Sequence, residues 1–274
     1  MRRIDRCDFS PLEVAVACCS TIADQARKTR ITDNIGKIVQ ASIDYAIAAE
    51  AGELDSFAST RYDPLGTATT SDFEWLYETR LVQSNPGRKY YLSMRDSNDE
   101  RCALCNVRTS TTLDHHLPKS LNAVLAVTPD NLLPACETCN HIKLASTIAT
   151  LNSYFDDLGS GPWLRARILE QTPYVPDFYL DPQPSWGADL EGRAQAHFEM
   201  FGLRRLYASQ ANRQLAGIRG LLRDLDRKIG PPAVQQYLSD SAISFSLAEP
   251  NGWETAVYQA AASSEFFWSG GYDY

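Results

Sequence analysis

The chain lacks the long apolar runs and the excess positive charge that would mark a membrane protein or a protein that coats nucleic acid. Its fairly apolar stretch at residues 12–23 is interrupted by Glu13, is too short to cross a bilayer and is followed by no small-residue cleavage site. The 26 basic residues are outnumbered by 34 acidic ones, for a net charge of −8 at pH 7. This balance argues against binding of nucleic acid through bulk electrostatics. The 44% of hydrophobic residues is enough for a core, and we expect a globular, cytoplasmic protein.

Positive charge is concentrated in one segment, residues 203–228. The segment contains seven basic residues and only two acidic ones, Asp224 and Asp226. The basic residues are Arg204, Arg205, Arg213, Arg219, Arg223, Arg227 and Lys228. The segment is the best candidate for a local nucleic-acid surface. The simpler interpretation is a solvated helix face with charges spaced i,i+4.

Four of the seven cysteines form two Cys-x-x-Cys pairs, Cys102/Cys105 and Cys136/Cys139. In a reducing compartment such pairs are more often metal ligands than disulfides, and two tight knuckles can converge on one ion. The spacing predicts a structural tetrahedral zinc site. The remaining cysteines are expected to be small buried side chains, and they are Cys7, Cys18 and Cys19.

The remaining pattern predicts helices around this segment. Ser10-Pro11-Leu12-Glu13 has the form of a capping box, so a helix should begin at Pro11 and run towards Lys28. Further helices are expected at 35–50, after a cap at Asp72, at 163–170, through about residue 229, and at 252–266. Loops are expected at 58–72 and in the proline-rich stretch 172–186.

The predicted fold is mainly helical, with a small zinc-stabilised ββα module, and belongs to the α+β class. We expect a helical N-terminal region at 1–95, the zinc module at 96–150 and a helical C-terminal region at 151–274.

Polar groups that suit catalysis are concentrated between the two knuckles. Asp114 follows a short apolar-containing run and should end a strand, Asn131 lies in the following loop, and Asn140 begins the helix after Cys139. A carboxylate, an imidazole and two amides would meet in a unit too small to fold without a metal. Such a site can hold a divalent cation and activate water.

These residues resemble the HNH endonucleases of the His-Me finger, or ββα-metal, group. The likeness rests on order and spacing: a Cys-x-x-Cys, then Asp-His-x-x-Pro at 114–118, then Asn-Leu-x-Pro-x-Cys-x-x-Cys-Asn at 131–140, then Lys143. The likeness implies an endonuclease that hydrolyses phosphodiester bonds of nucleic acid, with DNA favoured.

The resemblance also implies a role for each matching residue. His115, three positions before the proline, would be the general base, and Asp114 a ligand of the catalytic metal. Asn131 would steady the loop and hold the base through the backbone, and Asn140 would be the second ligand. Two oxygen ligands suit Mg²⁺ or Mn²⁺ better than a second zinc.

Other polar residues admit more than one interpretation. Lys119 and Lys143 would contact neighbouring phosphates or be ordinary solvated lysines. His116 would pack or touch substrate rather than catalyse, because of the proline register. His141 is an alternative ligand to Asn140, and His197 is most simply structural.

The chain further resembles HNH nuclease subunits of bacterial anti-phage systems of the Septu type, which act with an ATPase partner. That likeness implies a role in antiviral defence, with the partner supplying DNA affinity and restraint. Two other classes remain open: a non-catalytic zinc module that binds nucleic acid or protein, and a helical adaptor whose site has decayed.

Overall fold

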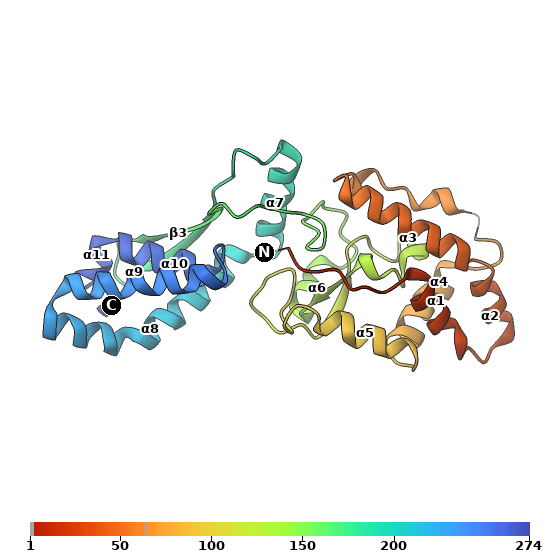
Figure 1. Cartoon of the computed structure of the whole chain (residues 1–274), viewed down its shortest axis with the longest axis horizontal. Coiled ribbons are helices and arrows are strands. Elements are labelled where there is room, and N and C mark those ends of the chain that lie inside the picture. The colour runs from red at the N-terminus through yellow and green to blue at the C-terminus, as the bar shows by residue number, and fades with distance from the viewer. Residues whose placement is uncertain (1–2, 64) are drawn as a thin grey trace. The chain divides into compact units, whose positions relative to one another are not determined.

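The computed structural model describes residues 3–63 and 65–274 and is mainly helical with two small antiparallel sheets, an α+β fold (Figure 1). The chain divides into two compact units, Met1–Asp157 and Leu158–Tyr274. No helix among the described residues has both the length and the apolarity needed to cross a membrane.

The helices of the first unit are α1 (Pro11–Ser20), α2 (Gln25–Thr32), α3 (Ile35–Glu50), α4 (Thr70–Trp75), the π-helical η3 (Leu76–Leu81) and α5 (Gly87–Asp96). The predicted bounds of α3 are confirmed. The single helix predicted from Pro11 towards Lys28 is wrong, because the chain leaves α1 after Ser20. Asp24 then caps α2 by accepting a hydrogen bond from the Arg27 amide, which makes a new helix start favourable.

The predicted cap at Asp72 is displaced by three residues. Thr69 is the N-cap of α4, and Asp72 is the third helical residue of the capping box. Its buried carboxylate is held by Arg27 at 3.1 Å and Arg30 at 2.9 Å. The hydrogen bond from Arg30, together with its charge and the Thr69 amide, lowers the pKa of Asp72 to about 2. This carboxylate therefore joins α2 to α4 as well as capping a helix.

The cysteine segment folds as strand, strand and helix. β1 (Thr112–His115) pairs antiparallel with β2 (Leu132–Ala135), and α6 (Glu137–Lys143) follows at once. The link between the strands contains the 3₁₀ turns η4 (Ala123–Leu125) and η5 (Pro129–Asn131).

One hydrophobic core serves the whole first unit. Buried side chains of α1, α3 and α5 belong to the same cluster as Leu113 of β1 and Leu132 of β2, and α5 packs against both strands. The regions predicted as 1–95 and 96–150 therefore fold together as one unit.

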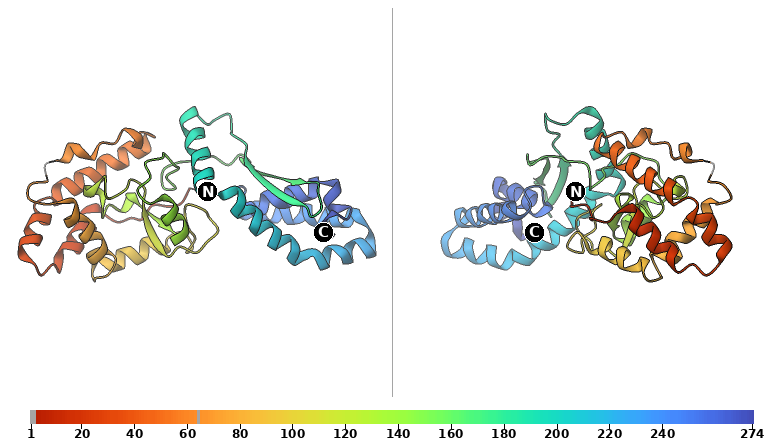
Figure 2. Two further views of the ribbon diagram at one scale, coloured as in Figure 1. Left: turned by 180° about the vertical axis from the view of Figure 1, so that it is seen from behind. Right: turned by 45° about the vertical axis from the view of Figure 1, so that its right-hand side comes forward.

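The second unit contains a hairpin and five helices. Its elements are β3 (Leu164–Leu169), β4 (Val175–Leu180), α7 (Ala188–Met200), α8 (Leu203–Ile229), α9 (Pro231–Ala248), α10 (Trp253–Ser263) and α11 (Glu265–Trp268). β3 packs on α10, and β4 packs on the long α8. The left view of Figure 2 shows these elements from behind.

Two predictions for this unit are wrong. The helix predicted at 163–170 is strand β3, and the loop predicted at 172–186 contains strand β4. Leu164 and Ile168 are both buried, a spacing that fits one helix face and one strand face equally well. Pro176 is tolerated in β4 because a strand of a two-stranded sheet has a free edge.

The helical prediction through residue 229 is confirmed by α7 and α8, whereas α9 was not predicted. The last predicted helix is divided at Ser264 into α10 and α11. Much of the basic charge of α8 is engaged within its own unit, since Arg204 pairs with Asp177 at 2.6 Å and Arg223 with Asp273 at 2.5 Å.

Candidate metal and catalytic site

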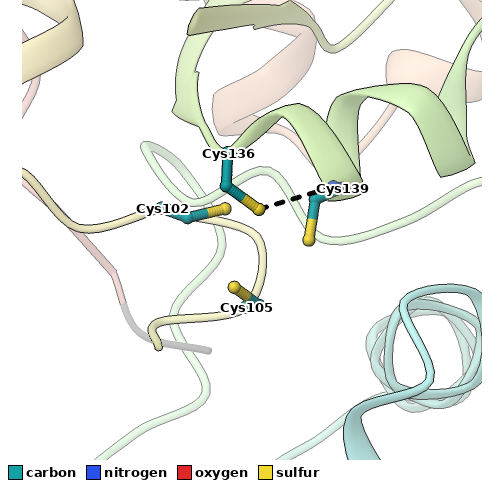
Figure 3. Close-up of side chains that lie close together, drawn as sticks. All are labelled: Cys102, Cys105, Cys136 and Cys139. Carbon is teal, nitrogen blue, oxygen red and sulfur yellow. Dashed lines mark hydrogen bonds between the residues drawn. The ribbon is translucent and has the colours of Figure 1, made fainter. Parts of the chain in front are cut away.

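The four paired cysteines converge as the sequence predicts. All are buried, and their Sγ atoms lie within 4.8 Å of one another. The side chains point towards a common centre, two from the loop before β1 and two from the start of α6 (Figure 3). Sulfur ligands about 2.3 Å from a tetrahedral zinc would lie roughly 3.8 Å apart, which fits this cluster. The cluster can hold a metal ion such as zinc.

The second knuckle is also the beginning of α6. Cys136 is the N-cap, and its sulfur accepts a hydrogen bond from the Cys139 amide at 3.4 Å. The guanidinium of Arg108 lies 3.9 Å from the Cys139 sulfur and offsets negative charge there. Hydrogen bonds from the thiols of Cys102 and Cys139 lower the pKa of Cys136 below its usual value. Sulfur-metal bonds here would fix the helix that carries Asn140.

Asp114 lies on the face of β1 that meets α6. Its Oδ2 is 3.2 Å from the Lys143 ammonium, and both side chains are only 2% exposed. The same ammonium donates to the His115 carbonyl at 2.5 Å. Burial raises the pKa of Asp114 to about 6, even though the charge of Lys143 acts in the opposite direction. This carboxylate therefore depends on a neighbouring cation to remain ionised near neutral pH.

His115 points to the opposite side of β1, as alternation along a strand requires. Its ring packs edge-on against Tyr77 of η3, with centroids 4.4 Å apart, and its Nε2 lies 2.9 Å from the Ala126 carbonyl oxygen. A carbonyl can only accept, so Nε2 carries the proton and Nδ1 keeps the lone pair. Burial lowers the pKa of His115 to about 3, and the charges of nearby lysines act in the same direction. The imidazole is neutral at pH 7, with its tautomer fixed.

Asn131 braces the loop that follows β1. Its Oδ1 accepts from the Leu117 amide at 2.8 Å, and its Nδ2 donates to the Leu117 carbonyl at 3.0 Å. The Asn131 carbonyl accepts from the His116 amide at 2.8 Å. Three hydrogen bonds from one buried residue hold the chain directly after His115, which agrees with the loop-steadying role expected for Asn131.

Asn140 lies in the first turns of α6, where its Nδ2 donates to Thr112 Oγ1 at 3.4 Å. It lines an open cavity of about 510 Å³ together with Glu137 and His141. Among the described residues, the ionic partner of Asp114 is Lys143, and the two expected metal ligands share no hydrogen bond. Asp114 projects from β1 and Asn140 from α6, and these two elements are in contact.

Lys119 and Lys143 are not free lysines. Lys119 pairs with Glu78 at 2.6 Å and lies 4.9 Å from the centre of the Tyr77 ring, and Lys143 is the buried partner of Asp114. The interpretation of Lys143 as a solvated lysine is therefore wrong, whereas Lys119 lies half-buried in its ion pair with Glu78. His197 is buried on α7 against Phe201, as expected for a structural histidine.

Sequence reasoning missed Tyr77 and Ala126, which orient the His115 ring. Ala126 acts through its backbone, which leaves no trace in the residue type. Tyr77 comes from a helix remote in sequence, and no spacing connects it with the cysteine segment.

Comparison with known proteins gives one distant similarity. No protein-family model and no solved structure matches the chain. The chain is similar to Protein ea31 of Escherichia phage lambda, with 28% identity over 253 residues that cover 82% of this chain and 85% of that protein.

Proposed function

We propose that the protein is a metal-dependent HNH endonuclease that hydrolyses phosphodiester bonds, with DNA as the favoured substrate. The observation that carries the proposal is the state of His115: a neutral imidazole with Nε2 engaged by a carbonyl and Nδ1 left as a proton acceptor. Burial keeps this imidazole neutral at pH 7, and the negative charge of a bound phosphate would raise its lowered pKa towards the neutral range in which a general base is most effective.

Asp114 and Asn140 would hold the catalytic Mg²⁺ or Mn²⁺. Their carboxylate and amide oxygens are the donors that hard cations prefer, and the raised pKa of Asp114 marks a buried carboxylate that needs a cation beside it. When bound, the ion would neutralise charge on the phosphate and on the leaving oxygen. Lys143 would then exchange the carboxylate of Asp114 for a substrate phosphate.

Each remaining group has a defined part in this scheme. His115 Nδ1 removes the proton from the attacking water, and the Ala126 carbonyl and the Tyr77 ring prevent the imidazole from turning away. Asn131 holds the loop behind the imidazole. Lys119, whose ammonium lies over the Tyr77 ring, can exchange Glu78 for a phosphate.

The resemblance to anti-phage nuclease subunits extends the proposal to a defence role with an ATPase partner. The acidic net charge of −8 supports it in one respect, because the partner rather than this chain would then supply affinity for DNA.

The test is nicking of supercoiled plasmid by the purified chain in Mg²⁺, Mn²⁺ or EDTA. His115→Ala should lower the rate on the order of 100-fold or more while the zinc content stays unchanged. Gln25→Ala serves as the control, because Gln25 is an exposed polar side chain of α2, a helix that carries none of the proposed site residues.

A non-catalytic zinc module is the competing function, and the burial of Asp114 with Lys143 is the observation in its favour. Nucleic-acid binding without cleavage by zinc-loaded wild type in Mg²⁺ or Mn²⁺ would support that module and refute the nuclease.

A further inference from the structure

A cavity of about 250 Å³ lies beside the loop that follows β1, entirely within the first unit. Three segments line it, residues 54–57, 116–122 and 146–150. It is somewhat smaller than the ~300–1,000 Å³ typical of pockets for drug-sized ligands. A single planar ring system is therefore the right scale of occupant.

Thr150 lines the cavity and is 2% exposed, and its Oγ1, which is covered by protein, has no hydrogen-bond partner within the described part of the chain. Buried hydroxyls are nearly always paired, so rotation of this side chain towards the cavity would give the hydroxyl a partner on a ligand with a hydrogen-bonding edge. Asn122, buried in the same wall, uses one amide hydrogen on the Pro118 carbonyl at 3.3 Å. Its other amide groups retain capacity for a ligand.

The rest of the cavity lining is mainly apolar. Phe57 contributes an aromatic ring, and the guanidinium of Arg61 lies 4.9 Å from the centre of that ring. Leu121 and Ile148 also line the cavity, although both are more than half exposed to solvent. Apolar walls with an aromatic ring, a few hydrogen-bonding groups and an adjacent arginine suit a nucleobase, which has apolar faces and a polar edge.

Position connects the cavity with the proposed catalytic residues. His116 lines it and directly follows His115, and consecutive Cα atoms are only about 3.8 Å apart. The brace from Asn131 holds both the His116 amide and Leu117, which also lines the cavity. The wall of the cavity and the base are thus fixed by one loop.

We propose that this cavity receives one unstacked nucleobase next to the phosphodiester that is cleaved. The inference rests on the proposed nuclease function and adds that the substrate is single-stranded, or locally opened, at the cut.

The cleavage test uses end-labelled single-stranded DNA in which one abasic position is moved along the strand, with cut sites mapped on a denaturing gel. Cleavage next to the abasic position should fall about tenfold, within the range that one stacked base contributes, while distant cuts are unchanged. Thr150→Val should lower the rate about threefold by removing only the hydroxyl.

The decisive variant is one in which a larger side chain fills the cavity. Ala149→Trp, at the half-exposed rim, should lower cleavage about tenfold and make the rate insensitive to the abasic position, whereas Ala145→Trp, exposed and outside the cavity, should behave as wild type. Zinc content confirms that both variants fold.

Binding separates this inference from the nuclease proposal. Fluorescence anisotropy on zinc-loaded protein without Mg²⁺ or Mn²⁺ should show a 12-nucleotide thymidine strand bound about tenfold more tightly than the same backbone lacking bases, and Ala149→Trp should abolish the difference. That result supports the cavity even if no cleavage is seen. Cleavage that ignores the abasic position, or equal affinity for the two strands, overturns the inference and leaves the nuclease standing on its own test.

Discussion

The ion pair between Asp114 and Lys143 is the most exacting test of how the site is held together. Both side chains are 2% exposed and lie 3.2 Å apart across the contact of β1 with α6. Lys143→Met removes the cation and leaves a buried carboxylate without a partner. Asp114→Asn removes the anion and leaves a buried ammonium without a counter-charge, still bonded to the His115 carbonyl.

The expected magnitudes follow from this burial. An attraction at 3.2 Å amounts to roughly 5 kcal/mol at an effective dielectric constant of about 20, before desolvation is subtracted. Removing one partner of a buried pair typically costs about 3–5 kcal/mol. Each single variant should therefore lose about 3 kcal/mol or more. The double variant, with an amide and a thioether of similar size, should lose much less than the sum, with a coupling of at least about 2 kcal/mol.

The assay is urea-dependent hydrogen exchange of peptides from 112–143, followed by mass spectrometry on zinc-loaded full-length chain. It reports on the first unit alone. At pH 8 the carboxylate of Asp114, with its pKa of about 6, is ionised in wild type. Without Lys143 that pKa rises further, so the folded form takes up a proton more readily than the unfolded chain. The cost of Lys143→Met should then grow as the pH is raised from 6 to 8.

Additive losses, with a coupling below about 0.5 kcal/mol, would refute this reasoning. That outcome would mean that the two charges are solvated independently and that the carboxylate needs no cation.

Three further predictions concern the frame of the site. Cys136→Ser should abolish metal binding and unfold the first unit, because structural zinc contributes about 10–16 kcal/mol, while exchange protection in residues 158–274 persists. Asn131→Ala should lower the free energy of unfolding by about 2–4 kcal/mol, measured by urea unfolding, because it leaves the half-buried Leu117 amide and carbonyl without their partner. Asn131→Asp, which keeps only the acceptor, should also destabilise. Because the pKa of Asp72 is lowered to about 2, its stabilisation is present above about pH 4 and fades as the pH falls through 2. Asp72→Asn should therefore flatten the acid limb of a stability-against-pH curve, and an unchanged slope would contradict the bond with Arg30.

The parts of the fold that sequence predicted best are those whose signals are local. The bounds of α3 and the convergence of four cysteines were both accessible, since helix periodicity and knuckle spacing are written within a few residues. The order strand, strand and helix between Cys102 and Lys143 also followed from local punctuation.

What failed depended on partners distant in sequence. β3 became a strand because β4 pairs with it, and a six-residue stretch with Leu164 and Ile168 buried carries no information that excludes a helix. The sequence likewise identified His115 but not its surroundings. The Tyr77 ring and the Ala126 carbonyl that fix its tautomer reach it through tertiary packing alone.

The shared core of the first unit has a practical consequence for engineering. A cassette cut at residues 96–150 would carry all four cysteines but would leave behind Tyr77 and α5, which cover one face of the β1–β2 sheet. Its exposed Leu113 and Leu132 would favour aggregation, and its imidazole would be free to swing. Grafting the motif onto another scaffold therefore requires the preceding helices as well, and the smallest transferable piece is the first unit as a whole.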